Sequence, residues 1–289
     1  MKIQSLSVVV PNKTCINNCR FCVSRMHENN YVNRMDVNDP LFDLNIRDYI
    51  KRLEFARDNG CNTVMLTGTS EPQQNKVFLT HFGLFMSILK NPFKIIEMQT
   101  TGVLLDMNYL RFLRNFVGVN TISLSLSSLS NEKNGEYNST PEAHRFVIST
   151  FCAAIKKLGF TLRLSLNMTD EFDGLQPEHL FKALQRLGAD QVIFRKLYAT
   201  QKKSAQRDWI IEHGAKDETL RAIFRYIRDN GRALEELEFG ETRYSVDGLS
   251  TVMDYDCMNS VAKKDLKYLI LREDCRLYSK WDDAASLIF

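Results

Sequence analysis

The chain has 289 residues and a formal net charge of +3, and 44% of its residues are hydrophobic and 25% charged. This composition is typical of one large globular domain and excludes a disordered or fibrous chain. No apolar run reaches the roughly 18 residues of a membrane-spanning helix, and the basic residues form only small groups, so neither a membrane nor a nucleic acid is favoured as a partner. Seven cysteines without a cleavable signal pattern predict a reducing, cytoplasmic location.

Six short runs rich in apolar and β-branched residues predict strands along the first two thirds of the chain. They lie at 6–10, 63–67, 94–99, 120–127, 160–167 and 191–195. Helical periodicity and turn residues predict helices at 46–59, 77–89, 107–116, 140–159, 176–187 and 216–230, the fourth beginning at Thr140 and Pro141. Since strands that alternate with helices form βαβ units, we expect an α/β protein with a parallel sheet. Six units are too few for a closed eight-stranded barrel, so the barrel should be open.

The last part of the chain has a different pattern, which predicts β-hairpins. One hairpin is expected at 243–253 around the turn Asp247-Gly248, and a second is expected from strands at 267–272 and 276–278. We therefore predict a core at 1–200, extending to about 231 with the sixth helix. A β-rich C-terminal extension at 232–289 should cap the barrel.

Three cysteines follow the first predicted strand in the pattern C-x3-C-x2-C, at Cys15, Cys19 and Cys22. Thiolates are soft ligands, and three of them can hold three irons of a [4Fe–4S] cluster while the fourth iron stays open. The alternative is a zinc site with His27 as the fourth ligand, although structural zinc usually takes two ligand pairs well apart. The pattern thus favours an iron–sulfur site and leaves zinc open.

This spacing, with the aromatic Phe21 before the last cysteine, resembles the signature of the radical S-adenosylmethionine (radical SAM) enzymes. The resemblance covers roughly residues 5–200. It implies a partial (β/α)6 parallel barrel whose open iron chelates the methionine part of SAM. It also implies reductive cleavage of SAM to a 5′-deoxyadenosyl radical that abstracts hydrogen from a substrate. Phe21 would pack beside the adenine, and an electron donor such as flavodoxin or ferredoxin would reduce the oxygen-sensitive cluster.

The segment 68–72 follows the second predicted strand and reads Gly-Thr-Ser-Glu-Pro. It is similar to the Gly-Gly-Glu-Pro element of the radical SAM family, although it lacks the second glycine. The resemblance implies that Gly68 and Glu71 contact the amino group of SAM. A glycine at this point also lets the backbone approach a ligand closely.

Polar residues within the later strands are further candidates for SAM contacts. Ser125 falls where the family places a serine on the ribose or carboxylate, and Asn167 is a candidate for the ribose or adenine. Arg163 could pair with the carboxylate of SAM, since buried arginine needs an anionic partner. Arg195, at the end of the sixth strand, could reach either SAM or a substrate anion.

The substrate is not identified by any motif that we find. The absence of a recognisable peptide- or RNA-binding module favours a small polar or nucleotide-like molecule, and modification of RNA or of a peptide stays open. The acidic residues near the C-terminus, Asp254 among them, could bind a polar substrate. Cys257 and Cys275 read as ordinary thiols, with a hydrogen-donor or methyl-carrying role as the alternative. A non-enzymatic zinc or iron–sulfur binding protein is the alternative of another class. The oligomeric state and the fate of SAM stay open.

Overall fold

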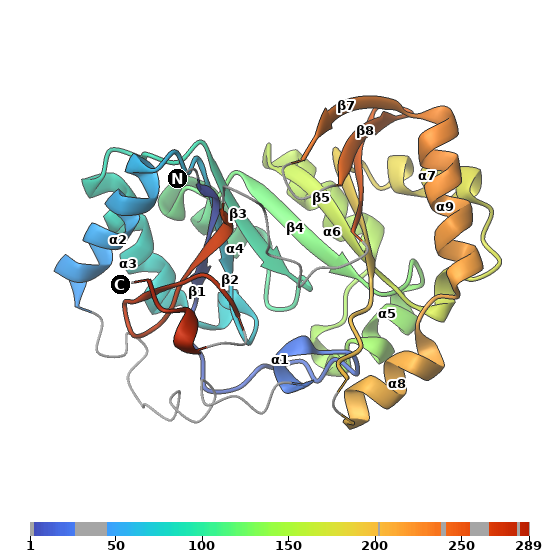
Figure 1. The fold of residues 1–289 in the computed structure, drawn as a ribbon, viewed down its shortest axis with the longest axis horizontal. Helices are drawn as coiled ribbons and strands as arrows, with labels where there is room; N and C mark the ends of the chain where they lie inside the picture. The colour runs from blue at the N-terminus through green and yellow to red at the C-terminus, as the bar shows by residue number, and fades with distance from the viewer. Residues whose placement is uncertain are drawn as a thin grey trace.

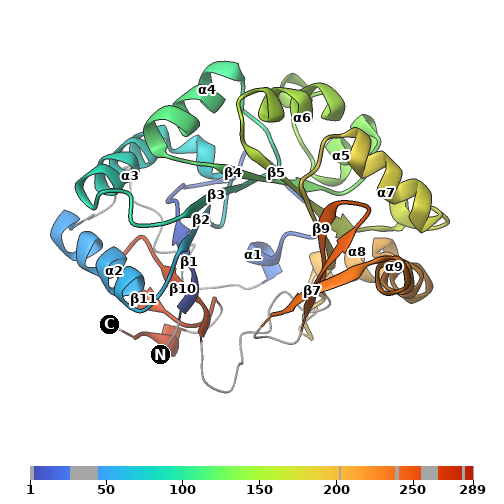
Figure 2. The ribbon, with the colours of Figure 1, turned by 90° about the horizontal axis from the view of Figure 1, so that it is seen from above.

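The computed structural model describes residues 3–26, 45–201, 203–237, 241–254, 266–281 and 284–288. In this part of the chain one sheet holds eleven strands, in the order β11-β10-β1-β2-β3-β4-β5-β6-β9-β8-β7. Figure 2 shows that the sheet curves into an open arc, with most helices on its outer side and α1 (Val23–Met26) on its inner side. The predicted α/β fold with an open, largely parallel barrel is confirmed.

All six predicted strands are present and pair in parallel with their neighbours. They are β1 (Ile3–Val9), β2 (Thr63–Thr67), β3 (Ile95–Thr100), β4 (Thr121–Leu126), β5 (Thr161–Met168) and β6 (Gln191–Lys196). Their apolar side chains lie under the helices, as the run of buried Ile122, Leu124 and Leu126 in β4 shows. Because successive side chains of a strand point to opposite faces, the serines between them face the inside of the arc.

The C-terminal strands join the sheet at both of its edges. They are β7 (Arg232–Glu236), β8 (Thr242–Val246), β9 (Leu249–Asp254), β10 (Leu266–Leu271) and β11 (Leu277–Tyr278). The two predicted hairpins are confirmed, and the first turns through Asp247 and Gly248, both at positive φ. However, β9 also pairs in parallel with β6, and β10 with β1, so these strands lengthen the barrel sheet on either side. The division near residue 231 and the capping role stay predictions.

The helices follow the strands in the expected alternation (Figure 1). The longer ones are α2 (Ile46–Asp58), α3 (Lys76–Ile88), α4 (Met107–Phe112) with the π-helical turn Leu113–Val117, α5 (Asn131–Tyr137), α6 (Ile148–Lys157), α7 (Pro177–Arg186), α8 (Ala205–His213) and α9 (Asp217–Asn230). Short 3-10 turns lie at Pro72–Gln74, Glu142–His144, Asp170–Phe172 and Ala284–Ser286. None of the helices in the described ranges has the length and apolar character needed to cross a bilayer.

The predicted start of the fourth helix is wrong. Pro141 leads into the 3-10 turn Glu142–His144, and α6 begins only at Ile148. The backbone N–H of Ile148 donates to the side-chain oxygen of Asn131 (2.9 Å), so the first residue of α5 satisfies one donor of the first turn of α6. A long-range cap of this kind overrides the local signal of a threonine followed by proline.

Candidate functional site

The cysteine loop, residues 11–22, leaves β1 at the carboxyl ends of the parallel strands. The turn after β2 holds it: the N–H of Ile16 donates to Oε1 of Gln74 (2.8 Å), and Nε2 of Gln74 donates to the carbonyl of Thr14 (2.9 Å). The side-chain amide of Asn75 donates to the carbonyl of Pro11 (2.7 Å). The polar residues of the segment 73–75 therefore fix the loop that carries the three cysteines.

The thiols of Cys15, Cys19 and Cys22 are half-buried, unoxidised and close enough to influence one another electrostatically. Burial raises the pKa of Cys15, and it raises the pKa of Cys19 well above its usual range, with the neighbouring charge of Cys22 as the next cause. Thiols held this close together resist ionisation, and a cationic centre stabilises their thiolate forms and releases their protons. The donor set fits an iron–sulfur cluster.

A zinc ion fits these thiols less well. Among the described residues, no three His, Cys, Asp or Glu side chains converge closely enough to ligate a single metal ion. Zinc would bring its sulfurs to within about 4 Å of one another, since each lies roughly 2.3 Å from the metal. A cubane cluster places each thiolate on a different iron and accepts wider spacing. His27, the fourth ligand of the zinc alternative, lies outside the described residues.

Glu71 lies buried beside the cysteine loop, and hydrogen-bond donors surround its carboxylate. Oε2 accepts from Nε2 of Gln73 and from the hydroxyl of Thr100, both at 2.7 Å. Oε1 accepts from the backbone N–H (3.0 Å) and the hydroxyl (2.7 Å) of Thr101. Because a carboxylate has about four acceptor positions, these bonds already orient Glu71 fully. Sequence reasoning named Glu71 but did not connect it with the threonines at the end of β3.

The same network reaches the cysteine loop through Asn17. Its side-chain amide donates to the hydroxyl of Thr101 (2.7 Å), and its carbonyl accepts from Nη2 of Arg25 (3.3 Å). Its own side-chain oxygen is buried and has no hydrogen-bond partner among the described residues. The loop between Cys15 and Cys19 is thereby tied to the carboxylate of Glu71, with Thr101 between them.

Gly68 lies where β2 and β1 end side by side. A Cβ added there would lie 3.0 Å from the carbonyl oxygen of Val10, a spacing that side chains rarely tolerate. The amide of Asn12 donates to the backbone carbonyl of Glu71 (3.2 Å), which closes the same corner. Glycine is therefore needed here for the close approach of two backbones, and that approach brings the segment 68–71 against the cysteine loop.

Ser125 and Asn167 lie near the carboxyl ends of β4 and β5, on the inner face of the arc. Ser125 pairs in register with Ser165, and Asn167 pairs with Arg195. The amide of Asn167 donates to the hydroxyl of Ser127 (3.4 Å). Both residues are half-buried, so they can meet a ligand held between the cysteine loop and the sheet.

Arg163 lies deeper in the barrel than the other candidates. It precedes Asn167 by four residues in β5, which corresponds to roughly 13 Å along the strand. Its guanidinium forms an ion pair with the buried Glu97, and its Nε donates to Oε1 of Gln191 (2.7 Å). The assignment of Arg163 to the carboxylate of SAM stays a prediction, and it would require this ion pair to open.

Phe21 joins a group of aromatic residues that sequence reasoning missed. Its ring lies 5.8 Å from that of Trp209 in α8, and Trp209 lies 5.3 Å from the ring of Tyr137 in α5. The N–H of Arg20 donates to the carbonyl of Tyr137 (3.2 Å). The cysteine loop is thus packed against α5 and α8 on its outer side. Neither helix was predicted, because neither shows a clear apolar stripe.

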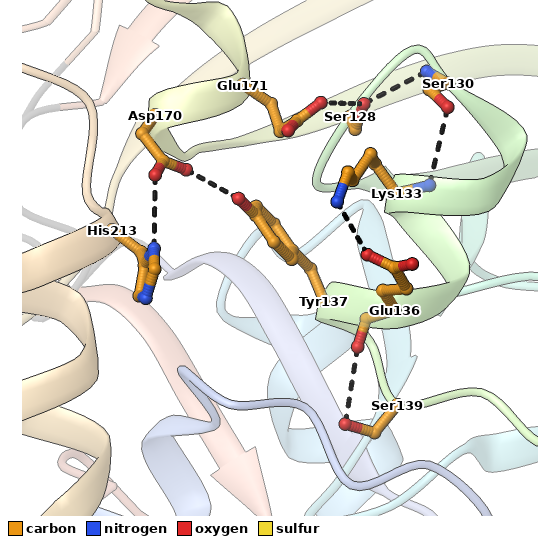
Figure 3. A network of polar contacts seen from close by, with 9 residues as sticks. All are labelled: Ser128, Ser130, Lys133, Glu136, Tyr137, Ser139, Asp170, Glu171 and His213. Atoms are coloured by element: carbon orange, nitrogen blue, oxygen red, sulfur yellow. Dashed lines mark hydrogen bonds and ion pairs between the residues drawn. The ribbon is translucent and has the colours of Figure 1, made fainter.

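Figure 3 shows how Asp170 orients this aromatic group. The hydroxyl of Tyr137 donates to Oδ1 of Asp170 (2.8 Å), and Nδ1 of His213 lies 3.1 Å from Oδ2. Burial, then the hydrogen bond to Asp170, raises the pKa of Tyr137, which therefore keeps its proton. An open cavity of about 630 Å³ adjoins the group, lined in part by Arg20, Arg145 and Trp209.

The three described cysteines outside the loop, Cys61, Cys152 and Cys275, are buried in the core. Burial raises the thiol pKa to about 11 at Cys61 and to about 12 at Cys152, so both keep their protons. Cys275 belongs to the core beside Tyr49 of α2, and burial raises its pKa as well. Cys257 lies outside the described residues. These environments are typical of ordinary structural thiols.

An open parallel barrel that presents three thiols and an anchored glutamate at the carboxyl ends of its strands defines an iron–sulfur enzyme of the α/β class. The chain belongs to the radical SAM superfamily, whose family model matches residues 9–169. The cofactors of this superfamily are a [4Fe–4S] cluster and SAM, and the thiols and the barrel described above fit both.

Solved structures show the same fold. Native anSMEcpe with bound AdoMet (SAM) is 14% identical, with a TM-score of 0.63 over 99% of this chain and 77% of that chain. Native anSMEcpe with bound AdoMet and Kp18Cys peptide is 12% identical, with a TM-score of 0.58 over 97% and 75%. A radical SAM methyltransferase from Sphaerobacter thermophilus is 14% identical, with a TM-score of 0.50 over 88% and 66%. A search of curated proteins finds no match.

Proposed function

We propose that this radical SAM enzyme binds its [4Fe–4S] cluster through Cys15, Cys19 and Cys22 and abstracts hydrogen from a small polar or nucleotide-like substrate. When bound, the cluster and SAM together supply an electron and a 5′-deoxyadenosyl radical. The observation that carries the proposal is the hydrogen-bonded chain from Glu71 through Thr101 to Asn17. It joins the cysteine loop to the residue that the family resemblance assigns to the amino group of SAM.

Different residues would bind the two ends of SAM. Gly68 and Glu71 would hold the methionine part, and the ammonium group would have to replace one of the four donors that surround the carboxylate of Glu71. Ser125 and Asn167 would bind the nucleoside from the inner face of the sheet, and Phe21 would cover the adenine. The aromatic contact of Phe21 with Trp209 closes the outer side of the loop, which helps to keep water from a reactive site.

The inner face of the barrel supports a polar substrate. It presents serines from β4 and β5 and charged residues from β3, β5 and β6, whereas most apolar residues of the same strands lie under the helices. Polar groups placed on a concave face orient a ligand by hydrogen bonds. Modification of RNA or of a peptide is the alternative, and an electron donor such as flavodoxin or ferredoxin in the cytoplasm would supply the reductant.

Anaerobic reconstitution tests this function directly. The wild-type protein is expected to bind about four irons, to show cluster absorbance and to form 5′-deoxyadenosine from SAM with dithionite. The triple variant C15A/C19A/C22A should bind no cluster and form none. C61A serves as a matched control, since Cys61 is a buried core thiol and its loss should leave iron content unchanged. Stable zinc binding by the wild type, with no SAM cleavage after reconstitution, would refute the proposal.

A further inference from the structure

The carboxyl ends of β5, β6 and β9 place three polar residues in one row. Asn167 pairs in register with Arg195, and Arg195 pairs with Asp254. Two residues before Asn167 in β5, Ser165 is in register with Ser125 of β4. Since alternate residues of a strand share a face, this row and Ser165 lie on the inner face of the arc. Asp254 comes from a strand beyond the residues that the family model matches.

Three atoms in or beside this row are buried without a hydrogen-bond partner among the described residues: Nε of Arg195, Oδ1 of Asp254 and the hydroxyl of Ser165. Ser165 is 1% exposed. The guanidinium Nε of Arg195 and Oδ2 of Asp254 are 3.8 Å apart, which is too far for a hydrogen bond. Buried polar atoms are normally satisfied in native proteins, so several that are not, on one concave face, indicate a place where a ligand completes the bonding.

A second arginine–carboxylate pair on the same face has hydrogen-bond partners for its polar atoms. Arg163 bonds to Glu97 and to Gln191, and Oε1 of Glu97 also accepts from Nε2 of Gln99 (3.1 Å). Every oxygen of that carboxylate has a partner. On the inner face, the pair near the carboxyl ends therefore differs from the pair that lies deeper in the barrel.

The charges of the row restrict what can bind there. An anion would be attracted by Arg195 and repelled by Asp254, and a cation would be attracted by Asp254 and repelled by Arg195. A neutral group with a hydrogen-bond donor beside an acceptor satisfies both: its donor meets Oδ1 of Asp254, and its acceptor meets Nε of Arg195. Amides, including the amide edges of cyclic bases, present such a pair of atoms in one plane, and both the guanidinium and the carboxylate are planar.

We propose that Arg195, Asp254 and Ser165 form the substrate-recognition site of the barrel, and that it binds a neutral amide-type group. This Arg195–Asp254 site rests on the proposed function, because a substrate must reach the inner face near SAM. The adenosine of SAM also carries donor–acceptor edges. Occupancy by the substrate and occupancy by SAM therefore have to be separated by experiment.

Three small probes of one shape test the site: acetamide is neutral, acetate is an anion and acetamidinium is a cation. Their dissociation constants are measured by ligand-observed NMR on the cluster-loaded protein, with and without saturating SAM. For the wild type, acetamide should bind at least threefold more tightly than either ion, and saturating SAM should leave its affinity unchanged. D254N should make acetate the preferred probe, and R195Q should make acetamidinium the preferred probe. S165A should weaken acetamide.

The matched control is D190N, because the carboxylate of Asp190 lies outside the row, where it pairs with Lys156 and accepts from the backbone N–H of Leu162. It should leave the order of the three probes unchanged, and thermal melts show whether each variant is folded. Displacement of acetamide by SAM would assign the site to the cofactor and overturn the proposal. If no variant changes the order of affinity of the three probes, the proposal is also overturned. Failure to form 5′-deoxyadenosine would refute the proposed function alone, because probe binding does not depend on SAM cleavage.

Discussion

The hydroxyl of Thr101 connects Glu71 to the cysteine loop, and T101V removes this connection while keeping the side-chain shape. The hydroxyl donates to the carboxylate of Glu71 and accepts from the amide of Asn17, both at 2.7 Å. A hydrogen bond to a charged group contributes about 1.5–3 kcal/mol and a neutral one about 0.5–1.5 kcal/mol. The backbone N–H of Thr101 still bonds to Glu71 in the variant. We therefore expect the free energy of unfolding to fall by roughly 2–4 kcal/mol.

The assay is urea unfolding of the cluster-free protein at pH 7, followed by far-UV circular dichroism. The matched control is T80V, because the hydroxyl of Thr80 makes one exposed bond, to the carbonyl of Lys76 in α3. T80V should change the free energy of unfolding by less than about 0.5 kcal/mol. If T101V falls within that same range, the hydroxyl does not couple the two loops and the argument from the network fails.

Two further changes test the packing of the site and of the core. G68A should lower the free energy of unfolding by at least about 1 kcal/mol, because its Cβ would lie 3.0 Å from the carbonyl oxygen of Val10. Urea unfolding measures this free energy, and an unchanged midpoint would contradict the close approach of the two backbones. For Cys152, burial raises the pKa from 9.0 to about 12, so the folded state keeps a proton that the unfolded state loses, and stability falls as pH rises above 9. Between pH 8 and pH 10 the wild type should lose about 1.4 kcal/mol more than C152A, and equal losses would contradict the raised pKa.

The strands could be predicted from the sequence because each is a short apolar run that is buried on one face and bounded by turn residues. The helix α5 could not, since its sequence Asn-Glu-Lys-Asn-Gly-Glu-Tyr has no apolar stripe. Contacts with distant residues support it: the hydroxyl of Tyr137 donates to Asp170, and the backbone carbonyl of Tyr137 accepts from the N–H of Arg20. Tertiary bonds decide such an element, and local propensity does not.

The same contrast between local sequence patterns and long-range contacts applies to the candidate site. Cysteine spacing alone indicated the candidate metal ligands, because three cysteines on one loop are a local pattern. Two of the three partners of Glu71, Thr100 and Thr101, are 29 and 30 residues away, and Glu97, the partner of Arg163, is 66 residues away. No local pattern identifies contacts of this kind. The pairing of β9 and β10 with the two edges of the barrel was missed for the same reason, since parallel neighbours need long connections.

The place of β1 in the sheet has a consequence for how the enzyme matures. β1 carries the cysteine loop, and its two neighbours are β2 and β10, which lie near opposite ends of the chain. During synthesis one edge of β1 stays unpaired until residues 266–271 leave the ribosome. Strand pairing of such high sequence separation is slow. Cluster insertion into a loop supported by both neighbours of β1 would therefore follow the synthesis of residues 266–271, and a product truncated before them would expose an open strand edge beside the three cysteines.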